Sequence, residues 1–302
     1  TKATVSDLLS EEDYTRASGL MQLAESARFL IAPVLCAFVM TRGGLTAVLI
    51  IDLLTIITTI AAVLVIAKGL VSKESVNKQA YKQSLLQGFE AINKNAGIRV
   101  LVVFLILLTF MVGTIQELST PLILSFTNTR TLSIMITIAA FGMVLSSIYL
   151  GARELKGCKI IIFGISAFLA GLAMVGFGAL ENVFVITLSG FLFFATLPFL
   201  NSIADYFVRV NIPNILQGRV FGILGTITQL GYLLAYALSG FLSDYAFRPL
   251  LSEGGALTDT IGKIIGVGSG RGIGLFIIVE GFVLMVIATL LSKNKALSQL
   301  KG

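Results

Sequence analysis

The sequence contains no histidine, and its only cysteines are Cys36 and Cys158. Histidine is the commonest metal ligand and the commonest proton shuttle near neutral pH, so its absence argues against a metalloenzyme or a hydrolase. Two isolated cysteines make neither a disulfide framework nor a metal cluster. We therefore expect a protein that is not an enzyme, with no catalytic residues, no metal site and no cofactor.

Charge is also scarce. Asp, Glu, Lys and Arg make up 13 % of the chain, whereas soluble domains carry about a quarter. Hydrophobic residues make up 56 % and occur in long uncharged runs, so water cannot be the solvent for most of the surface. Because lipid offers the backbone no hydrogen bonds, runs of this length predict helices rather than the short alternating strands of a barrel.

Eight apolar stretches are long enough to cross the roughly 30 Å of hydrocarbon in a bilayer. They cover residues 18–40, 45–67, 98–125, 132–151, 159–180, 183–208, 219–247 and 272–292. The segment 1–17 is polar and acidic, and it lacks the basic start and apolar stretch of a signal peptide. The sequence therefore predicts an all-α fold, a polytopic membrane helical bundle with eight transmembrane helices.

The longest polar segment, residues 68–99, separates the second span from the third and is typical of a linker between two bundles. Within it, residues 84–93 place Leu85, Leu86, Phe89 and Ile92 at helical spacing, which predicts a short amphipathic helix. Two placements remain open for this helix: the membrane surface or the underside of the bundle.

The distribution of basic residues predicts the topology. If the chain starts in the cytoplasm, segments on that side hold sixteen of the 22 Lys and Arg residues, the opposite side holds five, and Arg28 lies within a span. Basic loops stay on the cytoplasmic side, so we expect both termini of this chain there. The net charge of +6 then reflects topology, and we expect no nucleic-acid partner.

The first span carries small residues and a proline at Gly19, Ala32, Pro33, Cys36 and Ala37. It resembles the fifth helix of major facilitator superfamily exporters, whose antiporter motif is Gly, eight residues, Gly, three residues, Gly-Pro, two residues, Gly-Gly. Gly19 and Pro33 match, other small residues replace three glycines, and Arg28 breaks the pattern. Such residues let a helix kink and approach a neighbour, as a rocking interface needs. An ordinary kinked helix is the alternative.

Three further segments resemble the macrolide-efflux and enterobactin-exporter branch of that superfamily. Residues 10–22 resemble the loop and entry of its helix five. Residues 151–159 resemble a degraded copy of the basic loop between its helices eight and nine. Residues 217–222 and 240–244 resemble the two ends of its helix eleven. The resemblance implies helices five to twelve, without about the first four. It divides the chain into a remnant of an N-terminal bundle (1–67), a cytoplasmic linker (68–97) and a C-terminal six-helix bundle (98–302).

The resemblance also implies a function. Members of this superfamily rock two bundles about a site near the bilayer midplane, exposing it alternately to each side. We expect efflux of a small hydrophobic or amphipathic molecule, macrolide-like or siderophore-like, coupled to a proton or ion and carried out by a monomer in a bacterial cytoplasmic membrane. The alternatives are a lysophospholipid flippase, a nutrient importer, or a truncated fragment that transports nothing.

Polar residues inside spans are the best pointers to a site, because an unpaired charge in lipid costs several kcal/mol. The candidates for substrate or coupling contacts are Gln22, Glu25, Arg28, Gln116, Glu117, Asn201 and Gln229. Glu25 either binds a proton or cation, or forms a structural ion pair with Arg28, three residues away on one helical face. Asp52, Asp205 and Glu280 are interpreted as packing groups or span-end residues.

Candidates for a cytoplasmic gate lie at predicted helix ends, where cations can bind the last carbonyl groups of a helix. They are Arg153, Glu154, Lys156 and Arg219. Topological anchoring is the alternative. At the opposite side, glycines alternate around Arg271 in residues 266–274, but no strand precedes them, which argues against a phosphate-binding turn. We expect these glycines to permit a tight turn and close packing, and the loop 248–271 to cap the outer vestibule.

Overall fold

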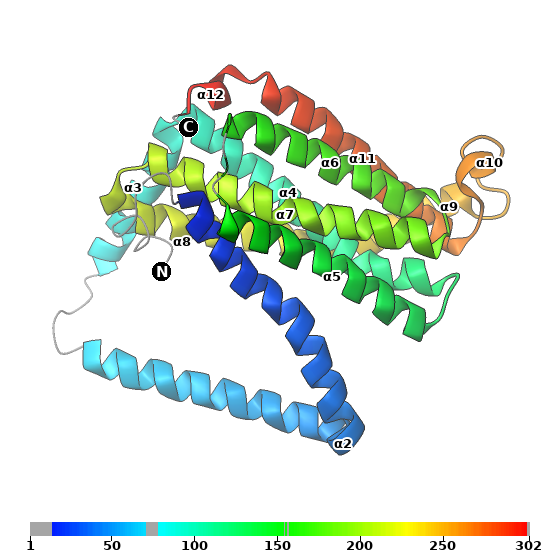
Figure 1. Ribbon diagram of the computed structural model, residues 1–302, viewed down its shortest axis with the longest axis horizontal. Coiled ribbons are helices and arrows are strands. Elements are labelled where there is room, and N and C mark those ends of the chain that lie inside the picture. Colours follow the sequence, from blue (N-terminus) through cyan, green and yellow to red (C-terminus); the bar gives the residue numbers. More distant parts are fainter. Residues whose placement is uncertain (1–13, 71–77, 154, 156, 301–302) are drawn as a thin grey trace.

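A computed structural model describes residues 14–70, 78–153, 155 and 157–300 of the chain, and its regular elements there are helices (Figure 1). The long ones are α2 (Tyr14–Leu70), α3 (Lys78–Lys94), α4 (Ala96–Leu124), α5 (Thr129–Ala152), α6 (Lys159–Ala179), α7 (Val183–Asn211), α8 (Asn214–Leu242) and α11 (Ser269–Ser292). The short ones are η2 (Ser243–Phe247), α9 (Arg248–Leu251), α10 (Gly262–Ile265) and α12 (Lys295–Ser298). The predicted all-α fold is confirmed.

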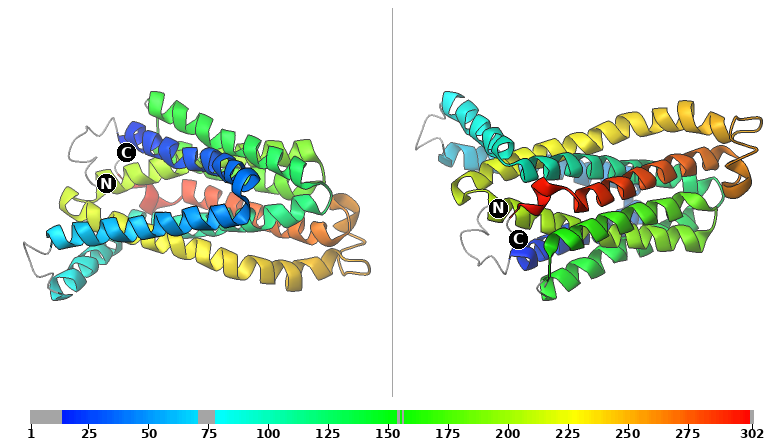
Figure 2. Two further views of the ribbon diagram at one scale, coloured as in Figure 1. Left: turned by 90° about the horizontal axis from the view of Figure 1, so that it is seen from below. Right: turned by 90° about the horizontal axis from the view of Figure 1, so that it is seen from above.

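Six helices, α4 to α8 and α11, form a bundle in which each helix runs in the opposite direction to the one before it in this series (Figures 1 and 2). One end of this bundle carries α3 and α12 and is called the α3 end below. The opposite end carries α9 and α10 and is called the loop end. Every long helix of the bundle therefore begins at one of these ends and finishes at the other.

Local sequence sets where the bundle helices begin. Asn95, Asn128 and Asn182 stand just before α4, α5 and α7, and each side-chain oxygen accepts a hydrogen bond from a backbone N–H of the first turn, at 3.0 to 3.2 Å. These bonds satisfy donors that a helix leaves free at its start. Pro213 precedes α8, where its missing N–H costs nothing.

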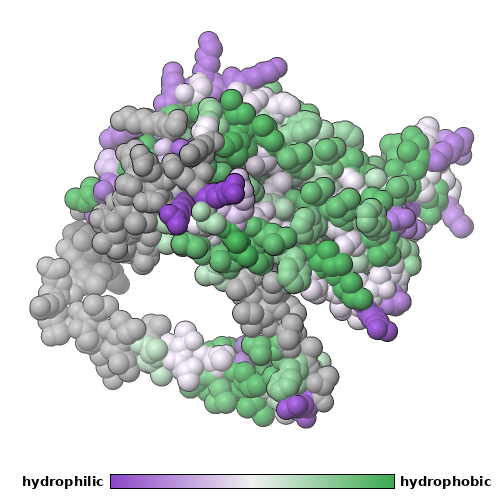
Figure 3. Space-filling model, in the orientation of Figure 1, coloured by the Kyte–Doolittle hydropathy of each residue, from purple (hydrophilic) through white to green (hydrophobic). Residues whose placement is uncertain are grey.

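Within the described residues, seven helices are long and apolar enough to cross a membrane: Arg42–Ala62, Ala96–Leu124, Thr129–Ala152, Lys159–Ala179, Val183–Asn211, Asn214–Leu251 and Gly270–Ser292. They match seven of the eight predicted spans. The remaining one, residues 18–40, is helical within α2, but most of its side chains lie outside the part that the structure describes. On the face of the bundle that Figure 3 shows, apolar residues cover the middle and polar residues gather toward the two ends.

Helices α6 and α11 approach closely because two glycines of one face two of the other. A methyl group on Gly171 would lie 2.6 Å from the carbonyl oxygen of Gly281, and one on Gly281 would lie 2.6 Å from that of Gly171. One heptad along, a methyl group on Gly274 would lie 2.6 Å from the oxygen of Gly178. Without a hydrophobic effect between helices in lipid, such close backbone contact is a main source of attraction.

Helix α2 bends sharply at Gly44, whose φ of 63° and ψ of −170° suit glycine. Its first arm starts against α5 and α7, where Tyr14, Ser18 and Gln22 are buried. Its second arm returns toward the α3 end apart from the bundle (Figure 1), and the described side chains of residues 42–64 are exposed or half-buried. The two arms correspond to the first two predicted spans.

Helix α3 confirms the predicted helix and extends it to residues 78–94. It packs against α8: Ile92 is 6 % exposed, and a methyl group on Gly88 would collide with Ile223. Leu85, Leu86 and Phe89 remain exposed. Of the two placements predicted for this helix, contact with the bundle is therefore observed, and an apolar face is left over.

Candidate functional site

The first polar feature lies at the α3 end, where α2 crosses α5. A methyl group on Gly19 would lie 2.7 Å from Cβ of Leu150 and 2.9 Å from the backbone nitrogen of Gly151, so only glycine permits this crossing. Beside it, the Nε group of Arg16 donates a 3.0 Å hydrogen bond to the carbonyl oxygen of Gly151. Gly19, a residue of the motif-like pattern, is thus placed at the contact between α2 and the bundle.

Beside this crossing, Arg209 of α7 is buried at 2 % exposure. Its guanidinium lies 5.7 Å from the ring centre of Tyr14 in α2 and 5.1 Å from that of Phe221 in α8, distances typical of cation–π contacts. The amide of Gln217 donates to the carbonyl oxygens of Arg209 and Ile212, at 2.8 and 3.0 Å, and so caps the end of α7. Three helices are joined at this end.

A second polar feature lies between α4 and α8. The hydroxyl of Tyr236 donates a 3.0 Å hydrogen bond to the side-chain oxygen of Gln116. Gln116 also lines a cavity of about 160 Å³ between α4, α5 and α7, together with Ser119, Thr187 and mainly apolar side chains. Tyr236 lines a shallow hollow on α8 that also contains Gln229. Of the predicted cavity residues, Gln116 is hydrogen-bonded to Tyr236, and Gln229 lines the same hollow as Tyr236.

The other predicted cavity residues lie elsewhere. Glu117 is exposed on α4, and Asn201 is half-buried on α7 and lines neither of these hollows. Gln22 is buried near the start of α2 at 5 % exposure. The backbone of α2 is helical through residues 25–37, but the side chains of Glu25, Arg28, Ala32, Pro33, Cys36 and Ala37 lie outside the described part of the structure, as does the expected Glu25–Arg28 pair.

Two of the predicted gate residues, Arg153 and Arg219, lie at the α3 end. Arg153 follows the last residue of α5 and is exposed, and Arg219 donates a hydrogen bond from its guanidinium to the side-chain oxygen of Gln87 in α3. Arg219 therefore ties the amphipathic helix to α8. Glu154 and Lys156 lie outside the described residues.

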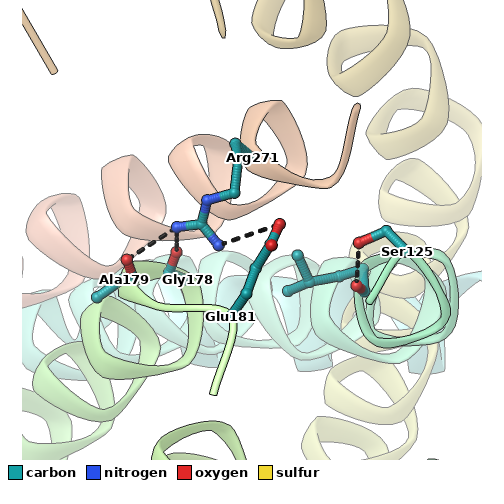
Figure 4. A network of polar contacts seen from close by, with 6 residues as sticks. Ser125, Gly178, Ala179, Glu181 and Arg271 are labelled. Carbon is teal, nitrogen blue, oxygen red and sulfur yellow. Dashed lines mark hydrogen bonds and ion pairs between the residues drawn. The ribbon is translucent and has the colours of Figure 1, made fainter. Parts of the chain in front are cut away.

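At the loop end lies Arg271, which has the largest fully buried side chain among the described residues, with 1 % exposure (Figure 4). Its Nη2 donates to the carbonyl oxygens of Gly178 and Ala179 at 2.9 and 2.8 Å, and its Nη1 lies 3.9 Å from a carboxylate oxygen of Glu181. The guanidinium thus binds the carboxyl end of α6, where the helix dipole favours a cation. The sequence placed Arg271 in a loop and missed this role.

The glycines around Arg271 allow that arrangement, as expected. Gly266 and Gly268 have φ angles of 96° and 143°, which other residues rarely adopt. A methyl group on Gly272 would lie 2.7 Å from the backbone nitrogen of Arg248, so α11 begins in close contact with α9. The tight turn and close packing predicted for this run are confirmed.

A third polar feature is a contact between two residues that the sequence did not predict, and it is buried inside the bundle. Thr114 of α4 and Glu280 of α11 are 0 % and 5 % exposed, and the hydroxyl oxygen of Thr114 lies 3.1 Å from Oε1 of Glu280. Glu280 was interpreted as a packing or span-end residue. The signal that could have singled it out is its position near the middle of an otherwise uncharged span.

The bundle of membrane-length helices, its exposed apolar side chains and its buried polar contacts define the chain as a multi-pass α-helical membrane protein. The model of the Major Facilitator Superfamily matches residues 1–236, and the chain belongs to this family.

Two relatives support the same family. Macrolide efflux protein A of Streptococcus pyogenes is 23 % identical over 248 residues, covering 78 % of this chain and 60 % of the relative. Macrolide efflux protein A of Enterococcus faecalis is 23 % identical over 228 residues, covering 74 % of this chain and 71 % of the relative. No solved structure matches the chain significantly. The chain thus spans about three fifths of the length of the streptococcal relative.

Proposed function

We propose that the chain is part of a secondary-active exporter in a bacterial cytoplasmic membrane, and that its cargo is a small hydrophobic or amphipathic molecule of the macrolide type. Export is coupled to the movement of a proton or another ion. The proposal is supported by the family, by the names of the two relatives and by the crossing of α2 on α5 and α7.

That crossing is the observation that carries the proposal. At the start of α2, Tyr14, Gly19 and Gln22 are buried, whereas the described side chains of its second arm are exposed or half-buried. Helix α2 is held at its start by glycine contact and a hydrogen bond, and its second arm lies apart from the bundle. Two bundles that rock about a common site require such a contact between them. We therefore propose that residues 1–67 belong to one bundle, 98–302 to the other, and 68–97 to a linker.

The cargo would contact the surface around Tyr236. Gln116, Tyr236 and Gln229 offer a few hydrogen-bonding groups among aromatic and aliphatic neighbours, which suits a large amphipathic molecule better than an ion or a sugar. The α3 end carries Arg16, Arg99, Arg219 and Lys293 among its basic residues, so we propose that it faces the cytoplasm. The Arg16 and Arg209 contacts then close the inner side.

The test is transport in inverted membrane vesicles from cells that express the complete reading frame. A radiolabelled macrolide should accumulate when the vesicles are energised, and a protonophore should abolish the accumulation. Gly19→Leu should abolish it too, because the leucine side chain collides with Leu150 and Gly151. Gly240→Ala, in a helix position where a methyl group meets no atom within 4 Å, is the matched control.

Three outcomes would reject the proposal. Uptake by right-side-out vesicles alone would show an importer, and transfer of a fluorescent lysophospholipid without macrolide movement would show a flippase. If the protein is present in the membrane and neither orientation moves any of these probes, the chain is not part of a transporter of this class.

A further inference from the structure

Glu280 is a carboxyl group with almost no contact to solvent. It lies near the middle of the span Gly270–Ser292, is 5 % exposed, and its Oε1 has one hydrogen-bond partner, the hydroxyl of Thr114. Its Oε2 is buried and has no hydrogen-bond partner among the described residues. An ionised carboxylate in such surroundings is very costly, whereas the neutral acid is tolerated.

The proton count of the hydrogen bonds favours the neutral acid as well. The hydroxyl oxygen of Thr114 lies 3.2 Å from the carbonyl oxygen of Phe110 and 3.1 Å from Oε1 of Glu280. A threonine hydroxyl has one proton, and neither a carbonyl nor a carboxylate can donate. Both contacts are full hydrogen bonds only if Glu280 carries a proton on Oε1 and donates to Thr114, which in turn donates to Phe110.

Among the described residues, no cation is placed to stabilise the ionised form of Glu280. The charged residues of the elements packed against α11 are Arg99 and Glu117 on α4, Lys159 on α6, Asp244 in η2, Arg248 in α9 and Lys295 in α12. Within the described residues, none of them forms an ion pair with Glu280, and the cation on the same helix, Arg271, is bound to the end of α6. With no cation of the described part of the chain beside it, the buried carboxyl of Glu280 avoids an uncompensated charge only by binding a proton.

We propose that Glu280 is the proton-carrying residue of the transport cycle. In this conformation its carboxyl is protonated and hydrogen-bonded to Thr114, which holds α11 to α4. When α4 and α11 separate within their own bundle, a local change beside the rocking of the two bundles, water reaches the carboxyl. Its O–H bond then breaks, the proton passes to that water, and the ionised group stays hydrated. A proton taken from water on the other side restores the contact. The transport role rests on the proposed function, while the protonation does not.

Protonation is tested directly by infrared difference spectroscopy on the purified protein in lipid bilayers. At neutral pH, a buried carboxyl that stays protonated gives a C=O stretching band. This band should be lost in Glu280→Gln. Thr114→Val should keep the band and shift its frequency, because the hydrogen-bond partner is removed. Glu253→Gln, which changes an exposed loop carboxyl, should leave the band unchanged. A spectrum that is the same in wild type and Glu280→Gln would overturn the proposal.

Coupling is tested with the same variants in inverted vesicles. Glu280→Gln stays neutral at every pH, so it should lose transport driven by a proton gradient while retaining exchange of labelled for unlabelled macrolide. If Glu280→Gln still concentrates the macrolide in response to the gradient, Glu280 is not the coupling group. If wild type moves no macrolide in any assay, the proposed function fails, while the infrared result still decides whether Glu280 is protonated.

Discussion

The contact between α6 and α11 makes the sharpest prediction about stability. Gly171→Ala adds a methyl group 2.6 Å from the carbonyl oxygen of Gly281 and 2.9 Å from the backbone nitrogen of Met285. Ordinary van der Waals contact begins at 3.4 Å, so the first contact is short by about 0.8 Å. Both opposing atoms belong to the backbone and cannot rotate away, so the two helices must move apart.

The cost follows from that displacement. Overpacking costs about 1–3 kcal/mol, and a gap of about 0.5–1 Å forfeits a quarter to a half of each dispersion contact along the interface. We expect Gly171→Ala to lower the free energy of unfolding by about 2–3 kcal/mol. Gly281→Ala should cost a similar amount, and the double variant less than the sum, because one displacement relieves both collisions.

The measurement is unfolding by sodium dodecyl sulfate in mixed micelles, followed by far-UV circular dichroism. Gly240→Ala is the matched control, since its methyl group meets no atom within 4 Å. There alanine should be neutral or stabilising by up to about 1 kcal/mol, through its higher helix propensity. Equal midpoints for Gly171→Ala and Gly240→Ala would refute the close approach of α6 and α11, and fully additive losses would refute the shared displacement.

Three further predictions concern the polar contacts and the helix crossing. Arg271→Met should lower the free energy of unfolding by about 3 kcal/mol, because two charge-assisted hydrogen bonds to α6 are lost. Glu181→Gln should lower it by less than about 1 kcal/mol, because the ion pair of Glu181 with Arg271 is long and partly exposed. Both changes are read from the same denaturant titration, and equal losses would contradict the capping role. A double-mutant cycle of Gln116→Leu and Tyr236→Phe should give a coupling of about 1 kcal/mol, and a coupling near zero would show that the hydrogen bond does not form. Gly19→Leu should speed amide hydrogen exchange at the start of α2, and unchanged protection there would argue against the α2–α5 contact.

The membrane fold was largely predictable from sequence. Uncharged runs of bilayer length have few stable solutions in lipid, so seven of the eight predicted spans correspond to the helices Arg42–Ala62 and Ala96–Leu124 and the five that follow. The helix ends were less accurate, because a helix continues past the apolar run whenever its next residues find contacts. Helix α8, for example, starts at Asn214 rather than 219, where Gln217 is buried and caps α7.

The site was predicted only in part. Gln116 and Gln229 could be selected because polar residues are rare in spans. Tyr236, which binds Gln116 and lines the same hollow as Gln229, is an ordinary aromatic residue in sequence. Which polar residues meet depends on how helices far apart in the chain rotate and pair. No local pattern contains that information.

The sequence by itself determined that this chain lies in a membrane as a set of helices, because solvent and backbone hydrogen bonding leave no other arrangement for such runs. Only the tertiary structure decided that Thr114 faces Glu280 across 166 positions of chain and that Arg271 binds the end of α6. Those contacts depend on the glycine-lined approach of α11 to α6 and on the packing of α11 against α4. Such packing is a property of the whole bundle, since each helix face is apolar and equally acceptable to lipid until a matching surface meets it.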